Sequence, residues 1–95
     1  MLIQKLVSPG DVVTIKTVVG DELMATLDQV EPEHIKVSKP MAIVASGQGL
    51  GLAPYAFTIT QDAKIDMYKH SIVFYCKSDI EMEKQYIQTT TGISV

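Results

Sequence analysis

Short segments in which apolar and polar residues alternate fill most of the chain before residue 77. Alternation with a period of two, together with many β-branched residues, predicts β-strands that each bury one face. Turn residues separate the segments, because Pro fixes φ and Gly permits positive φ. The predicted strands are residues 12–18, 22–31, 34–39, 55–60, 64–68 and 72–76. Leu23, Ala25, Leu27, Ile35, Val37, Phe57 and Ile59 lie in phase on their strands.

Five or so short antiparallel strands joined by tight turns favour an all-β fold. Strands of this length and spacing are typical of a small five-stranded barrel or a strongly bent sheet. Such a barrel has strand edges to hide, and edge-to-edge pairing between subunits would hide them.

Residues 40–54 interrupt the alternation with Gly47, Gly49 and Gly51 among small and apolar residues. The segment is predicted as a variable loop, or as a loosely paired hairpin extension. A phosphate-binding loop is a poor interpretation, because no Lys-Ser/Thr pair follows the glycines and Pro54 opposes an immediate helix. An apolar ridge of Leu50, Leu52, Tyr55 and Phe57 is an alternative, and it would dock a protein partner.

The last residues change period. Ser78 and Glu81 fit a capping box, with Ser78 at the cap. Ile80, Lys84 and Ile87 follow at helical spacing, so a short C-terminal helix ending near Thr89 is predicted within a helix-or-tail segment of about 78–95, with a frayed end. We expect one domain over residues 1–95.

Composition adds a charge argument to this pattern. The 95 residues weigh 10.4 kDa, and eight lysines against eleven acids give 8 − 11 = −3, with no arginine. This balance excludes a broadly basic nucleic-acid binder. Apolar residues make up 46% of a chain too short to bury them all, which indicates oligomerisation.

Little else in the sequence indicates chemistry. The single cysteine, Cys76, cannot form an internal disulfide and is expected to be a small core residue. Two histidines and one cysteine argue against a zinc site. No triad can be defended, so we expect no enzyme, no cofactor and no metal. No signal peptide or membrane span is visible, and a soluble cytoplasmic protein is expected.

A resemblance enters at residues 65–72, Ile-Asp-Met-Tyr-Lys-His-Ser-Ile. This run resembles the second Sm motif of the bacterial Sm-like RNA chaperones of the Hfq type, whose signature is Tyr-Lys-His-Ala-Ile. Residues 13–20 resemble the strand and glycine turn that open the first Sm motif. The resemblance covers residues 12–38 and 64–76 and leaves the rest unmatched, as in a divergent, phage-type relative.

The resemblance implies a bent five-stranded barrel and closed rings of about five to seven subunits, in which one strand edge pairs with the next subunit. It also implies RNA binding near the pore, where the family's residues matching Lys69 and His70 lie. A ring repeats one weak lysine–phosphate contact several times within about one Debye length. Tyr68 and His70 add rings that can stack on bases. Without the resemblance, the same residues are a polar hairpin turn with Tyr68 as a packing residue.

The turn at residues 31–34 carries the second set of candidates. The resemblance implies an acidic residue, matched by Glu31, and an aromatic one that stacks a base. The aromatic position falls on Glu33, a departure from the family, and His34 replaces it only if the turn is shifted by one residue. Five acids and no lysine lie between residues 21 and 33, which also allows a solvated acidic turn.

Three functions are therefore open. The first is a ring-forming Sm-like protein that binds RNA or other single-stranded nucleic acid near the pore, with a non-catalytic role in RNA processing or chaperoning. The second is a structural or protein-interaction ring that has the fold without the ligand. The third is a small barrel of another family, monomeric or dimeric, which a mass measurement would distinguish from a ring.

Overall fold

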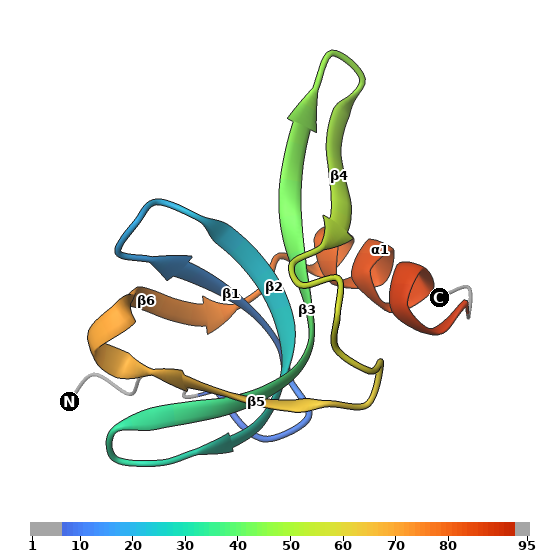
Figure 1. The fold of residues 1–95 in the computed structure, drawn as a ribbon. Coiled ribbons are helices and arrows are strands. Elements are labelled where there is room, and N and C mark those ends of the chain that lie inside the picture. Colours follow the sequence, from blue (N-terminus) through green and yellow to red (C-terminus); the bar gives the residue numbers. More distant parts are fainter. Residues whose placement is uncertain (1–6, 93–95) are drawn as a thin grey trace, which may run out of the picture.

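The computed structural model describes residues 7–92, and these form a mostly antiparallel sheet with one short helix near the C-terminus (Figure 1). The elements are β1 (Val12–Thr17), β2 (Glu22–Val30), β3 (His34–Ser46), β4 (Gly49–Pro54), β5 (Lys64–Tyr68), the 3₁₀ turn η1 (Lys69–Ser71), β6 (Ile72–Lys77) and α1 (Ile80–Thr91). The predicted β-rich fold and C-terminal helix are confirmed. The sheet has six strands rather than the five of the predicted barrel, and one of the six, β4, lies in the segment predicted as a loop or hairpin extension.

The sheet follows the order β4-β3-β2-β1-β6, and β5 pairs with β3. The 13 residues of β3 are long enough to serve two partners on one edge. Its first part pairs with β5 and its last part with β4. The strands β5 and β6 lie at different ends of this order, yet the three residues of η1 join them, so the sheet must curl (Figure 1). Among residues 7–92 no ladder pairs β5 with β6, and the sheet is open.

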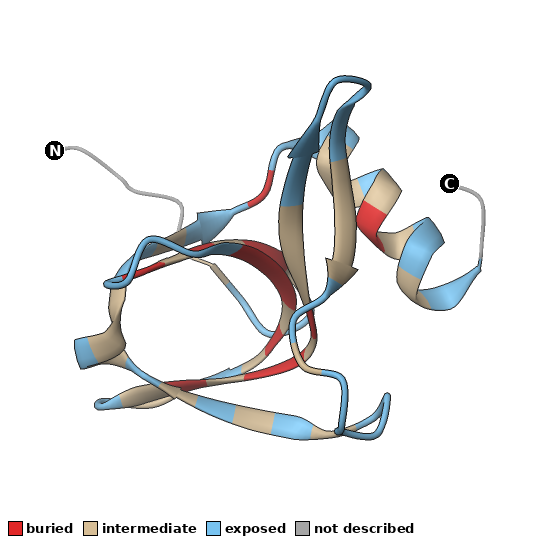
Figure 2. Cartoon of the chain, turned by 45° about the horizontal axis from the view of Figure 1, so that its top comes forward, coloured by how far each residue is buried: buried red, intermediate tan, exposed pale blue. Residues whose placement is uncertain are grey.

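Most of the buried residues lie on β1, β2 and β3 (Figure 2), and the main core is the cluster that these strands form. Five of its seven fully buried residues lie at the alternating positions that the sequence predicts, and Val13 and Ile15 of β1 complete the set. The five are Leu23, Ala25, Leu27, Ile35 and Val37. Ile65, Met67, Ile72 and Tyr75 pack against them from β5 and β6.

A second buried cluster covers the opposite face of β1 and β2. Val12 and Met24 point away from the first core and pack with Tyr86 of α1. Tyr86 is 1% exposed and is the buried residue of the helix. Its hydroxyl donates to the carbonyl of Lys39 at 2.7 Å and shares a 3.1 Å hydrogen bond with Thr26. The helix is therefore anchored to the sheet by one aromatic residue.

The variable segment is a hairpin extension made of the end of β3 and all of β4, with Ile43 opposite Leu52. The predicted strand at residues 55–60 is wrong. The outer edge of β3 is occupied by β5 from His34 to Ser38 and by β4 from Met41 to Ser46, so no edge of β3 is left for the link 55–63. Phe57 is consequently 84% exposed.

Two smaller predictions were also wrong. Asp79, not Ser78, caps α1, since its carboxylate accepts from the amides of Glu81 and Met82. Ser78 is buried and instead shares a 2.8 Å hydrogen bond with Thr14. Cys76 is exposed rather than part of the core. No helix within residues 7–92 is long and apolar enough to cross a membrane.

Candidate nucleic-acid interface

The five candidate residues lie in two neighbouring turns of the curled sheet or at the strand ends beside them (Figure 1). The first turn joins β2 to β3 and the second is η1. The amide of Lys69 donates to the carbonyl of Glu33 at 2.9 Å, which ties the turns together. The amide of Glu31 donates to the carbonyl of His34 at 2.8 Å and closes the first turn.

Three aromatic rings form a row across these turns. His34 and Tyr68 are opposite each other in the β3–β5 ladder, and their ring centroids are 5.7 Å apart at 53°. Tyr68 and His70 are two residues apart, and their rings stack at 5.9 Å and 24°. Tyr68 is 51% exposed, so the middle ring is open to solvent as well as packed. The row offers flat, accessible faces of the kind on which unpaired bases stack.

One cation lies beside the row without an ionic partner. Lys69 is half-buried, and none of the ion pairs among residues 7–92 involves it. A lysine in this position can take one phosphate. Its ammonium therefore supplies the positive charge of the candidate site.

Acidic residues surround the same row. Asp66 lies 3.6 Å from Nε2 of His34 and accepts from Nζ of Lys36 at 2.9 Å. The hydrogen bond from Lys36 holds the pKa of the Asp66 carboxyl below its usual value, and the same bond raises the pKa of Lys36. Asp66 is thus a fixed anion at neutral pH. Glu31 accepts from the side-chain amide of Gln29, and Glu33 is exposed. The site is mixed in charge rather than basic.

A hollow of about 290 Å³ adjoins Lys69, lined also by residues 72–75 of β6. Lys16 pairs with Phe74 and Thr17 with Ile72, so Val73 is an extra residue in a bulge. The bulge leaves two consecutive apolar side chains outside, with Val73 62% and Phe74 47% exposed. Strand periodicity alone predicts one of them inward, so the sequence gives no signal for this apolar edge.

The sequence analysis also missed Asp66 and Lys36. Asp66 is two residues before Tyr68 on the same strand, so the period of two would have placed its side chain on the face of Tyr68. Lys36 is two residues after His34 on β3, so the same period places its side chain on the face of His34. Only the β3–β5 register, which pairs Lys36 with Asp66, shows that the two charges meet.

The described residues contain no group of three or more His, Cys, Asp or Glu side chains that could hold a metal ion. Models of known protein families and curated proteins were compared with the chain, and none of them matches it.

Proposed function

We propose that this protein is a ring-forming, non-catalytic Sm-like protein that binds RNA or another single-stranded nucleic acid at the turn η1, near the pore. The observation that carries the proposal is the row of His34, Tyr68 and His70 rings beside the ammonium of Lys69, which forms no ion pair within residues 7–92. The resemblance of residues 65–72 to the second Sm motif supports the family part of the proposal.

Free strand edges support the ring. Without the β3–β4 extension, five strands form the order β6-β1-β2-β3-β5, and within the described residues the outer edges of β5 and β6 have no strand partner. Unpaired edges invite pairing with another chain. The exposed Val73 and Phe74 on β6 would be covered by such pairing.

Binding in the ring would combine stacking with a few phosphate contacts. Each stacked base is worth about 1–3 kcal/mol, and the row supplies the faces. Lys69 supplies one phosphate contact per subunit, so a ring of about five to seven copies gives a salt slope of roughly −3.5 to −5 at most. The surrounding Asp66, Glu31 and Glu33 repel phosphates elsewhere, which favours strands whose bases reach the rings.

The test is the affinity for a fluorescent single-stranded RNA, measured by anisotropy at two salt concentrations. We expect Lys69→Ala with His70→Ala to weaken binding more than tenfold and to flatten the salt dependence. Lys84→Ala, an exposed lysine of α1, is the matched control and should leave affinity unchanged. Unchanged affinity in the double variant, with the assembly intact, would contradict the assignment of the site.

The ring itself is tested by mass. Light scattering of the native protein should give about five to seven chain masses. Phe74→Lys places a charge on the β6 edge and should lower the mass, whereas Val44→Lys on the hairpin, 46% exposed in the native chain, should not. A native mass near 10.4 kDa would refute the ring.

A structural or protein-interaction ring is the second candidate. It is favoured by the acidic flanks of the site and by exposed apolar residues on the hairpin and the link, where Leu50 is 54% and Phe57 84% exposed. A protein that forms the ring but binds neither RNA nor DNA at low salt would establish this candidate instead.

A further inference from the structure

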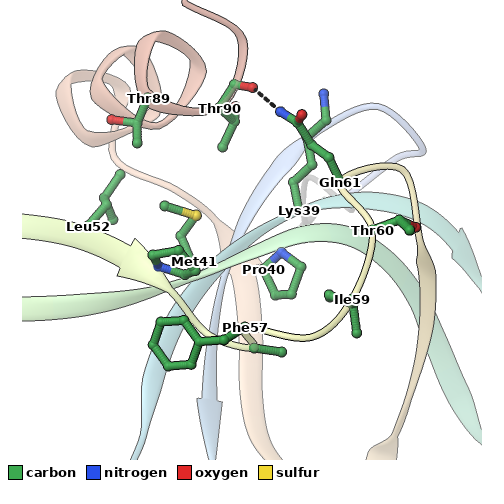
Figure 3. Close-up of a pocket in the computed structure, with 12 residues that line it drawn as sticks. Lys39, Pro40, Met41, Leu52, Phe57, Ile59, Thr60, Gln61, Thr89 and Thr90 are labelled. Carbon is green, nitrogen blue, oxygen red and sulfur yellow. Dashed lines mark hydrogen bonds between the residues drawn. The ribbon is translucent and has the colours of Figure 1, made fainter.

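A groove of about 460 Å³ is separate from η1, since none of residues 69–71 lines it (Figure 3). It is formed by the base of the β3–β4 hairpin, the link 55–63 and the last turns of α1. Figure 3 shows Phe57, Pro40 and Ile59 along one side, and Gln61, Thr89 and Thr90 along the other. The side-chain amide of Gln61 donates to the carbonyl of Thr90 at 2.9 Å and holds the link against the helix. This size is within the range of small-molecule sites.

The lining is apolar and carries a single charge. The apolar lining of the groove includes Met41, Leu52 and Phe57, and Lys39 is the charged residue among the twelve that line it. None of them is acidic, although acids outnumber lysines eleven to eight in the chain. Lys39 takes part in none of the ion pairs found among residues 7–92. The groove is therefore a locally positive, apolar surface on an acidic protein.

The backbone of Lys39 is held in an uncommon conformation. Its φ is +52°, the one positive value at a non-glycine residue in the described chain. Met24 pairs with Met41 and Thr26 with Ser38, so Lys39 and Pro40 form a bulge opposite Ala25. The hydroxyl of Tyr86 donates to the Lys39 carbonyl at 2.7 Å and fixes this bulge. Tertiary contacts thus fix the position of the Lys39 backbone at the edge of the groove.

We propose that this groove binds a small apolar carboxylate, such as a medium-chain fatty acid or an aryl-alkanoic acid. The apolar body would lie on Met41, Leu52 and Phe57, and the carboxylate would pair with Nζ of Lys39. A lone ammonium with no second cation matches one negative charge rather than a polyphosphate. Phe57, now 84% exposed, gains burial when an apolar ligand lies against it.

The experiment titrates the full chain with decanoate, 4-phenylbutyrate and the uncharged decanol, followed by amide chemical shifts. We expect saturable binding of at least one carboxylate, with shifts at Leu52, Phe57 and Thr90. Which carboxylate binds more tightly distinguishes an alkyl from an aryl ligand. Decanol should bind at least tenfold more weakly than decanoate if the alkyl chain is the ligand.

Lys39→Asn removes the charge and keeps a residue that tolerates positive φ. It should weaken binding of the carboxylate at least tenfold, and Lys39→Gly provides a second variant suited to this backbone. Lys84→Asn on the exposed face of α1 is the control and should bind as the native chain does. The proposal is overturned if neither carboxylate saturates, if shifts map to η1 instead of the groove, or if both Lys39 variants bind carboxylate as tightly as the native protein.

Discussion

Removing the Tyr86 side chain should undock α1 from the sheet. Tyr86 is 1% exposed, packs against Val12 and Met24, and hydrogen-bonds the Lys39 bulge and Thr26. No other residue of the helix is buried, although Met82 and Ile87 are packed against the same cluster. The packing of the helix on the sheet therefore depends mainly on one side chain, and two substitutions of Tyr86 can separate its contributions.

The two variants separate packing from hydrogen bonding. Truncating a buried aromatic residue to alanine costs about 3–5 kcal/mol, which we expect for Tyr86→Ala. Tyr86→Phe keeps the ring and removes the hydroxyl, leaving the Lys39 carbonyl without this donor, so we expect a loss of about 1–2 kcal/mol. For a domain of this size, the second loss lowers Tm by roughly 4–16 °C.

Burial also raises the pKa of the Tyr86 hydroxyl. Because the folded-state pKa is higher than the unfolded value of about 10, the contribution of Tyr86 is complete below pH 10 and is lost as pH rises further. The free energy of unfolding of Tyr86→Phe should therefore fall less above pH 10 than that of the native chain.

The assay is urea unfolding followed by circular dichroism, with Tyr55→Phe as the control. Tyr55 is 42% exposed and its hydroxyl donates to Asp21 at 3.3 Å on the surface, so the control should change stability by less than about 0.5 kcal/mol. If the free energy of unfolding of Tyr86→Ala lies within 1 kcal/mol of the native value, α1 is not anchored by this residue and the reasoning is refuted.

Two further perturbations test local features. Asp79→Ala should destabilise the protein by about 1 kcal/mol in the same urea assay, since the carboxylate caps α1, whereas the exposed Asp62→Ala should have little effect; equal losses would contradict the cap. Asp66→Asn should reduce the loss of stability in acid. The bond from Lys36 lowers the folded-state pKa of Asp66, so its contribution is present above the unfolded value of about 3.9 and is lost as pH falls through the folded value. Identical acid profiles for the native chain and the variant would contradict this.

Local pattern determined the strand faces. The inward positions Leu23, Leu27 and Ile35 follow from a period of two, and the change to helical spacing after residue 78 predicts α1. Neighbouring residues on a strand or helix impose these periods by themselves, so no partner is needed to detect them.

The long-range arrangement was decided by tertiary structure. Residues 55–60 have strand character, yet no strand edge was left to pair with them. Tyr86 lies outside the spacing of Ile80, Lys84 and Ile87 that predicts the helix, yet it anchors the helix, because it packs on the second apolar face of β1 and β2. A sequence specifies which face is apolar, but not which edge is free.

The candidate site also depends partly on local sequence and partly on tertiary structure. Its turn residues Lys69 and His70 were selected from the sequence by the motif they resemble. The His34–Tyr68–His70 row and the Lys36–Asp66 pair exist only because β3 and β5, distant in the chain, pair in one register. A shift of that register by one residue would turn these side chains to the other face and disperse the site. The sequence shows which side chains are present, whereas the pairing of distant strands decides which of them lie together in the site.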